Sequence, residues 1–276
     1  MWNYVKTGFH AARGHMGIWL LLFLYQFAWG FFLFRWIHSA VYPLLKRYPG
    51  DALASSDVML FWAEAEFWLT RTEEVMPYIW TLGAVLLARM VLTPLLDAGL
   101  YHAVHQRGII GKRSGRRLFL SGIRSFGRAF TLVYWIKIIA AILPLLYLVP
   151  WLHQLLLSAQ QWSDYLGSGL PAAVAYLLYL AFLQLLSMYV QFSIAAKQAA
   201  LSALTSLAKS LLRAVGIGLT ILAITGAAAL LSASISLVWA GLAAVILHQL
   251  YTVIRPFFSI WHVTAQHHLW KEKATI

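Results

Sequence analysis

Long apolar segments without charge, separated by short polar or basic segments, make up most of this sequence. The first extends from Gly17 to Phe34, and residues 165–196 and 214–254 also contain no Asp, Glu, Lys or Arg. A helix needs about 20 apolar residues to cross a bilayer, whose hydrocarbon core is about 30 Å thick. Because helices satisfy their own backbone hydrogen bonds in lipid, the pattern predicts an all-α, polytopic integral membrane protein.

The longest of these segments predicts two helices rather than one. Residues 214–254 would form a helix of about 62 Å at roughly 1.5 Å per residue, which is about twice the hydrocarbon thickness. We therefore expect the segment to fold back at Gly226 or in the serine-rich residues 232–236. The result is a single membrane domain, 1–276, with six predicted spans: 17–38, 77–103, 129–152, 169–195, 214–232 and 236–255.

Composition supports the membrane class and excludes several others. Of the 276 residues, 61% are apolar and 11% are charged, whereas soluble domains average about 45 to 50% and about 25%. Soluble, fibrous and disordered proteins are therefore excluded. The chain contains no cysteine, which excludes disulfides and thiolate metal sites.

The charge distribution predicts the topology. Lys and Arg outnumber Asp and Glu by 21 to 9, and basic residues concentrate between Arg107 and Arg128. Cytoplasmic loops carry such an excess, so we expect both termini and this segment in the cytoplasm, as in a multi-pass protein of the bacterial inner (plasma) membrane. Six of the nine acids lie between Asp51 and Glu74, where residues 58–69 predict an amphipathic helix on the outer surface.

Two basic segments are expected to form amphipathic elbow helices at the cytoplasmic surface, after the second and fourth spans. For a membrane protein this charge indicates anionic lipid headgroups as partners rather than nucleic acid. The predicted lipid-binding residues are Arg113, Arg116, Arg117, Arg124, Arg128, Lys209 and Arg213.

The two elbow segments also align with each other. LSGIRSFGRAF at 120–130 matches LSALTSLAKSL at 201–211, with Ser121 over Ser202 and Arg128 over Lys209. One interpretation is a parallel internal repeat of span, interfacial helix and span. The other is a chance match between two Ser- and Leu-rich membrane segments.

The segment LLDAGLYHAVHQRGIIGKRSGRRLFLSGIRSFGRAF at 95–130, with its shorter echo at 197–213, resembles the six-helix membrane domain found before some bacterial glycerophosphodiester phosphodiesterases and its uncharacterised stand-alone relatives. The resemblance extends over most of the chain from the second span onward. It implies a membrane module without a transferable active site. No segment between the spans is long enough to hold the catalytic barrel of those enzymes.

Ionisable side chains within the predicted spans are candidates for a binding site, because burying a charge in lipid is costly. The candidates for substrate binding are Arg89, Asp97, Lys137, Gln184 and Gln191. One interpretation is a polar cavity for an anionic ligand, a headgroup or a coupled ion. The alternative is structural: Asp97 pairs with Lys137, and Arg89 bonds to glutamines and to the carbonyl that Pro94 leaves free.

Histidines do not predict a metal site here. His102 and His105 are three residues apart, and His262, His267 and His268 cluster near the carboxyl end, but neither group has a convincing further ligand beside it. Histidines snorkelling to the interface are the preferred interpretation. Motifs for nucleotide binding, zinc proteases and serine hydrolases are absent from the sequence, so we expect no catalytic residues, cofactor or enzyme activity.

Two function classes follow, with an intramembrane enzyme as a less favoured third. The first is a transporter, or a membrane subunit of a transport system, which handles an amphipathic or anionic substrate and relies on a separate ATPase or other membrane subunit. The second is a non-transporting module that organises lipids or partner proteins through its basic interfacial helices.

Overall fold

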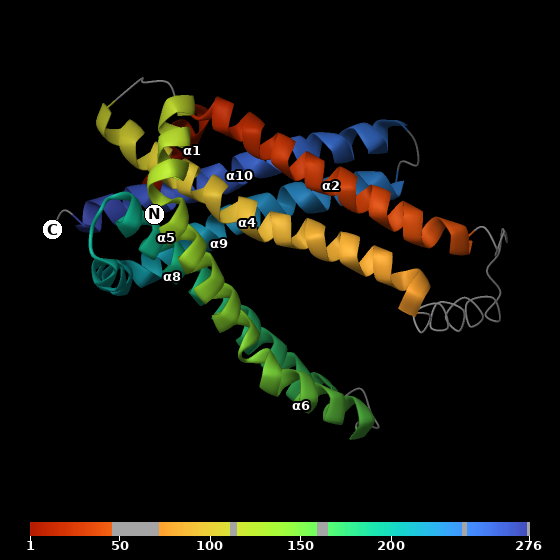
Figure 1. Cartoon of the computed structure of the whole chain (residues 1–276). Coiled ribbons are helices and arrows are strands. Elements are labelled where there is room, and N and C mark those ends of the chain that lie inside the picture. The colour runs from red at the N-terminus through yellow and green to blue at the C-terminus, as the bar shows by residue number, and fades with distance from the viewer. Residues whose placement is uncertain (46–71, 111–114, 159–164, 239–241, 275–276) are drawn as a thin grey trace. The chain divides into compact units, whose positions relative to one another are not determined.

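A computed structural model describes residues 1–45, 72–110, 115–158, 165–238 and 242–274. In these residues every regular element is a helix (Figure 1), which confirms the all-α class. The elements are α1 (Trp2–Arg13), α2 (Met16–Leu45), α4 (Thr72–Ile110), α5 (Gly115–Ile142), α6 (Leu145–Ser158), the π-helix η1 (Tyr165–Gly169), α8 (Leu170–Ala195), α9 (Ala200–Val238) and α10 (Leu242–Ala274).

Several helical segments are long and apolar enough to cross a membrane. Five such segments occur in the described residues: Met16–Ser39, Val75–Arg107, Gly115–Leu155, Gly167–Ala195 and Leu201–Ser234. They overlap the first five predicted spans, so the protein is a multi-pass membrane protein. The predicted sixth span, 236–255, includes residues outside the described ranges and stays a prediction, and the acidic segment 58–69 lies wholly outside them.

The predicted turn at Gly226 or in residues 232–236 is wrong. Helix α9 continues through both positions and ends at Val238. Glycine and serine are tolerated inside a membrane helix, because no water is present to replace its backbone hydrogen bonds. The chain therefore reverses later than its turn-forming residues indicated.

The two elbow segments are continuous with the helices that follow them. Residues 120–130 belong to α5 and residues 201–211 belong to α9, with no break in either helix. No proline occurs in α5 to interrupt it. The helix ends two residues before Pro144, as expected, because the residue that precedes a proline is disfavoured in the α conformation.

The connection between α8 and α9 is a tight turn with an unusual residue in it. Lys197 has a φ of 58°, in the left-handed region that favours glycine. Its backbone N–H donates to the carbonyl of Ile194 (3.0 Å), and that of Gln198 donates to the carbonyl of Ser193 (2.8 Å). These are the two hydrogen bonds of a Schellman motif, which satisfies carbonyl groups at the end of α8.

Internal contacts divide the chain into two compact units, Leu21–Thr93 and Met1–Leu20 with Pro94–Ile276. The single membrane domain remains a prediction. In the unit Leu21–Thr93, hydrogen bonds join α2 to α4. Trp36 donates its indole N–H to the carbonyl of Tyr78 (3.0 Å), and the hydroxyls of Tyr25 and Thr93 lie 2.7 Å apart.

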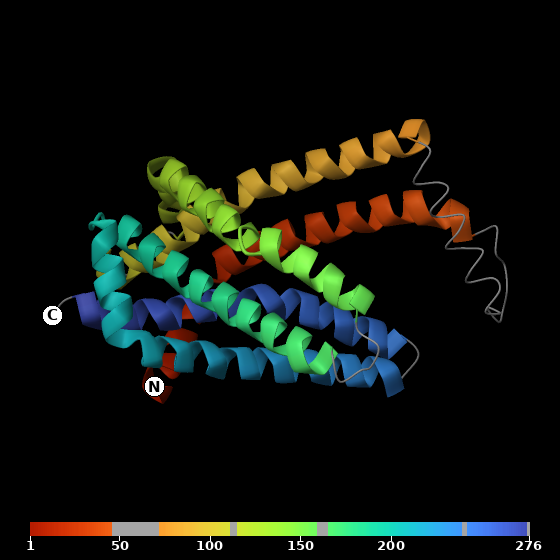
Figure 2. The same cartoon turned by 90° about the horizontal axis from the view of Figure 1, so that it is seen from below.

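In the larger unit, α9 and α10 lie side by side (Figures 1 and 2). The most buried part of this unit is the second half of α10, where Ile260, Ala265, Gln266 and Leu269 are fully buried. Helix α1 packs on α10, and α8 packs between α5 and α9. The core of this unit therefore forms around residues 256–270, which the sequence analysis placed in a cytoplasmic tail.

The contact between α1 and α10 is unusually close. A Cβ added at Gly8 would lie 2.6 Å from the Cα of Ala265, so the two backbones nearly touch there. Trp261 donates its indole N–H to the carbonyl of Val5 (2.8 Å), and the hydroxyl of Thr264 lies 2.8 Å from the carbonyl of Gly8. Small residues permit this approach, and side-chain hydrogen bonds then join the helices.

Candidate functional site

Helix α5 has two different faces. One is buried and contains glycine, and the other is exposed and basic. Phe119, Gly122 and Phe130 are buried. A Cβ on Gly122 would lie 2.6 Å from the Cβ of His102 on α4, so the two helices approach closely. The exposed basic residues are Arg116, Arg117, Arg124 and Arg128.

None of these four arginines is paired with an acidic side chain of the described residues. Helix α5 contains no Asp or Glu, and the four guanidinium groups have no ion-pair partner in the part of the chain that the structure describes. Arg113, the fifth predicted lipid-binding residue of this segment, lies outside that part. The described arginines therefore form a cationic face available to an anionic ligand.

The predicted basic residues of α9 lie in a different setting. Lys209 and Arg213 are both exposed. Near Arg213, the hydroxyl of Tyr4 donates to the carboxylate of Glu272, and this hydrogen bond raises the pKa of Tyr4, with a smaller contribution from burial. The positive charge at this position thus lies near a carboxylate, unlike the arginines of α5.

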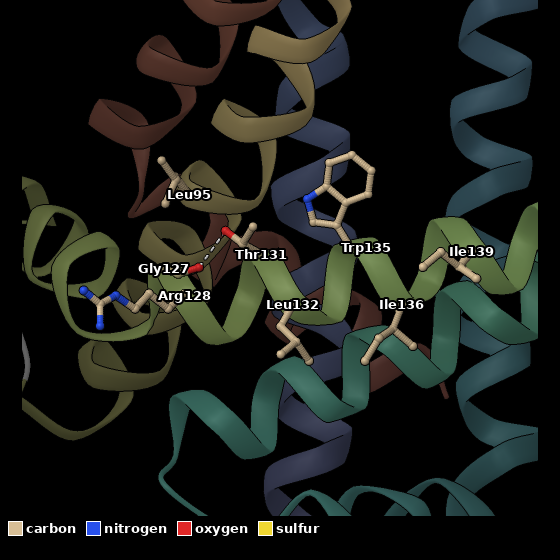
Figure 3. Close-up of a pocket in the computed structure, with 8 residues that line it drawn as sticks. All are labelled: Leu95, Gly127, Arg128, Thr131, Leu132, Trp135, Ile136 and Ile139. Carbon is tan, nitrogen blue, oxygen red and sulfur yellow. Dashed lines mark hydrogen bonds between the residues drawn. The ribbon is translucent and has the colours of Figure 1, made fainter.

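An apolar groove adjoins the basic face of α5. It is formed mainly by α5 with Leu95 of α4, has a volume of about 500 Å³, and is drawn in Figure 3. Its lining residues are Leu95, Gly127, Arg128, Thr131, Leu132, Trp135, Ile136 and Ile139. This volume falls within the roughly 300 to 1,000 Å³ of ligand pockets.

Two of the predicted intramembrane residues meet directly. Lys137 of α5 donates to the side-chain carbonyl of Gln184 on α8. Asp97 of α4 attracts Lys137 electrostatically, but the ion pair expected between them is wrong, since no such pair within 4.0 Å exists among the described residues. The lysine bonds to a neutral amide on the neighbouring helix instead.

Gln191 lies about two turns after Gln184, closer to the end of α8, and is buried. Other polar side chains are buried nearby on α8, α9 and α10. The hydroxyl of Tyr189 lies 3.4 Å from that of Ser210 and 3.5 Å from the amide oxygen of Gln266, and Gln266 donates to the carbonyl of Ala214 (2.7 Å). The interior of this unit therefore contains an interhelical polar network.

Arg89 belongs to the unit Leu21–Thr93 and is exposed. Its backbone carbonyl accepts a hydrogen bond from the hydroxyl of Thr93 (2.7 Å). Within the described ranges its guanidinium group has no ion-pair or hydrogen-bond partner. The bond to glutamines and a freed carbonyl, expected under the structural interpretation, is therefore not formed by the described residues.

The histidines are arranged differently from the sequence-based interpretation. His105 of α4 and His267 of α10 approach to 3.3 Å between Nδ1 and Nε2, although 162 residues separate them. His267 is only 4% exposed, so the snorkelling interpretation is wrong for this residue. The described residues contain no group of three or more His, Asp or Glu that could hold a metal ion.

Burial keeps two histidines of α10 neutral. It lowers the pKa of His262 to about 4 and that of His267 to about 3, with smaller contributions to the latter from His105, His268 and Lys271. The Nε2 atom of His262 is buried without a hydrogen-bond partner among the described atoms. Protonation would place a charge inside the packed unit, which low-dielectric surroundings disfavour.

The packing of α1 and the burial of the second half of α10 were not predicted from the sequence. One signal was available, because no charged residue occurs between Arg255 and Lys271, which is unusual for a solvated tail. The close approach at Gly8 had no comparable signal, since glycine also occurs at exposed helix positions such as Gly17.

Comparison with family models, with curated proteins and with solved structures found no match. The candidate site is therefore identified from geometry alone. It is a row of exposed arginines on α5 that continues into an apolar groove, beside an intramembrane lysine bonded to a glutamine.

Proposed function

We propose that this membrane protein binds anionic lipids and organises them in the membrane through α5. The observation that carries the proposal is the row of arginines on α5, which is exposed, lacks any acidic neighbour on its own helix and is backed by the closely packed face toward α4. Basic residues at a membrane surface each contribute about 1 kcal/mol to the binding of anionic lipids.

Lipid retention tests this proposal. The protein is extracted from a membrane with equal amounts of phosphatidylglycerol and phosphatidylcholine, and bound lipid is counted by native mass spectrometry. Replacing Arg116, Arg117, Arg124 and Arg128 with Gln should remove the preference for phosphatidylglycerol. The matched control replaces Lys6, Arg35, Arg255 and Lys271 with Gln, and should keep it. Equal preference in both variants would contradict the proposal.

A second candidate is transport of an anionic or amphipathic substrate, and the hydrogen bond between Lys137 and Gln184 favours it. Here a cationic side chain within a candidate span contacts a neighbouring helix without an ion-pair partner in the described residues. Intramembrane ionisable residues mark substrate and ion pathways in many transporters. The sequence contains no nucleotide-binding motif, so an energised transporter of this kind would need a separate ATPase or another membrane subunit.

Liposomes distinguish the two candidates. Purified protein is reconstituted with a fluorescent phosphatidylglycerol, and its movement between leaflets is followed by dithionite quenching. Transport predicts movement that Lys137→Met abolishes while Lys137→Arg retains part of it. A purely organising module predicts no movement above that of empty liposomes.

The proposed setting is a bacterial inner membrane with both termini in the cytoplasm, as the basic segments indicate. The proposed family is that of the membrane domains which precede glycerophosphodiester phosphodiesterases, in a form without enzyme activity. Because the chain contains no cysteine, single cysteines at positions 6, 209 and 167 can be labelled without background. We expect an impermeant reagent added to intact spheroplasts to label position 167 and neither of the others.

A further inference from the structure

The basic and apolar parts of the α5 surface occupy the same face of one uninterrupted helix. Arg124, Arg128, Leu132 and Ile136 follow one another at intervals of four residues, and residues four apart lie one above the other on a helix. Figure 3 shows Arg128 at one end of the row of groove residues, and Leu132 and Ile136 projecting from the same side of α5. The face changes from cationic to apolar between Arg128 and Leu132.

The apolar part of this face is open. Leu132, Ile136 and Ile139 are 57 to 60% exposed, so other described residues of this chain do not cover them. Between Gly127 and Ile139 the groove extends about 18 Å along the helix at roughly 1.5 Å per residue. It therefore has room for an elongated apolar group that lies along α5.

Gly127 keeps the groove continuous with the arginines. A Cβ at this position would lie 2.8 Å from the side chain of Leu95, which forms the opposite wall. The nearby Thr131 hydroxyl donates to the carbonyl of Gly127 (2.8 Å), so it places no unsatisfied donor in the groove. The lining from Arg128 to Ile139 is thus mainly apolar, with Thr131 and Trp135 as its polar-group carriers.

We propose that this groove holds one acyl chain of a phospholipid with a monoanionic headgroup, whose phosphate lies against Arg128 and Arg124. This proposal rests on the proposed binding of anionic lipid. The ligand must carry negative charge, because two guanidinium groups and no carboxylate of α5 face that end. It must also carry a long apolar chain, because the remaining lining is apolar. A second copy of this helix would instead bring arginines against arginines.

The groove and the arginines contribute differently to binding. An acyl chain gains no hydrophobic free energy by leaving the bilayer for the groove, since lipid is equally apolar, so the groove contributes packing and position. The charges contribute the preference for an anionic headgroup. Removal of either part should therefore change a different measurable property.

The test uses full-length protein in nanodiscs with equal amounts of phosphatidylglycerol and phosphatidylcholine, and native mass spectrometry counts the lipids retained. Arg124→Gln and Arg128→Gln should each lower the preference for phosphatidylglycerol roughly five-fold. Ile136→Trp, which fills the groove, should abolish retention of the tightly bound phosphatidylglycerol while the arginines remain. The matched control is Leu212→Trp on α9, at a position that is 88% exposed and outside the groove, and it should behave as the wild type.

The outcomes separate the two proposals. If the arginine variants lose the preference but Ile136→Trp and a second groove variant, Ile139→Trp, retain the lipid, the groove is not its site, although the proposed function stands. If the arginine variants also keep the preference, the proposed function fails. Displacement of the retained lipid by glycerol 3-phosphate alone would show that only a headgroup is bound, and would overturn the acyl-chain site. Unchanged melting temperatures confirm that each variant is folded.

Discussion

Helix α5 and the second half of α10 have similar compositions but opposite environments. Each is an apolar stretch next to basic residues, Arg128 before the groove residues of α5 and Lys271 after the buried part of α10. Leu132 and Ile136 of α5 are mostly exposed, whereas Ile260 and Leu269 of α10 are fully buried.

The two regions differ in small residues and hydrogen bonds. The groove residues of α5 lie within a candidate span, where lipid is as apolar as leucine, so an apolar side chain gains little by leaving lipid for protein. Helix α10 approaches α1 through Gly8, and its Thr264, Trp261 and Gln266 bond to backbone carbonyls of other helices. Most apolar side chains of the groove side of α5, Leu132, Ile136 and Ile139, are exposed instead, which leaves this side available to a ligand.

Gly8→Leu should have the largest effect on stability, because it disrupts the close packing of α10. Because a Cβ there would lie 2.6 Å from the Ala265 backbone, the side chain must push α1 from α10, and we expect a loss of about 3 kcal/mol in stability. Thermal melting in detergent, monitored by fluorescence-detection size-exclusion chromatography, measures this loss of stability. Gly17→Leu is the control, since nothing lies within 4 Å of its Cβ. Equal melting temperatures would refute the tight contact.

Acid should destabilise the buried half of α10. The pKa of His262 is lowered to about 4 and that of His267 to about 3, against about 6.5 when unfolded. The unfolded chain therefore binds more protons, so stability is complete above pH 6.5 and falls below it by about 1.4 kcal/mol per pH unit for each histidine. From these two histidines we expect a loss of roughly 2 kcal/mol between pH 7 and 5.5.

Melting curves at several pH values test this dependence. A variant with His262→Gln and His267→Gln should show a flatter dependence between pH 7 and 5.5. The control with His38→Gln and His153→Gln changes two exposed histidines and should keep the wild-type slope. A wild-type slope in the buried-histidine variant would assign the acid effect to other groups.

Gln266→Leu tests the polar network at the centre of the larger unit. The substitution removes the bond from Gln266 to the carbonyl of Ala214 and leaves a buried acceptor unsatisfied. We expect a loss of about 1 to 2 kcal/mol in thermal unfolding experiments. Gln198→Leu, at an exposed position after α8, should change stability little. A more stable Gln266→Leu protein would mean that packing outweighs this hydrogen bond.

Lys197→Gly should stabilise the connection between α8 and α9. Lys197 has a φ of 58°, and the left-handed conformation costs an L-residue about 1 kcal/mol that glycine avoids. We expect a gain somewhat below that value, because glycine also has more freedom in the unfolded chain. The melting temperature measures the gain, and Lys197→Ala serves as the control that keeps the strain. Destabilisation by glycine would point to a role for the lysine side chain.

The smallest effect on stability is expected on the exposed face of α5. Arg124→Gln and Arg128→Gln should each change the free energy of unfolding by less than about 0.5 kcal/mol, as is usual for exposed positions. Their lipid preference should change nevertheless. A large loss of stability in detergent would instead indicate that these arginines hold the fold together.

The sequence alone determined the membrane class and much of the helical pattern. Uncharged segments such as 165–196 are continuously apolar rather than alternating, so in lipid they satisfy their backbone as helices and not as strands of a barrel. The cationic character of α5 was also predictable, since Arg116, Arg117, Arg124 and Arg128 fall close together in the chain. The length of the apolar segments likewise placed Lys137 and Gln184 inside spans.

Which side chains contact each other across helices is known only from the tertiary structure. His105 and His267 are 162 residues apart and approach to 3.3 Å, and Lys137 selects Gln184 rather than Asp97 as its partner. The apolar groove on α5 also depends on the position of Leu95 from α4. Hydrophobic patterns could not predict these contacts, because in lipid they specify where a helix lies relative to the bilayer but not which of its apolar faces is covered by protein.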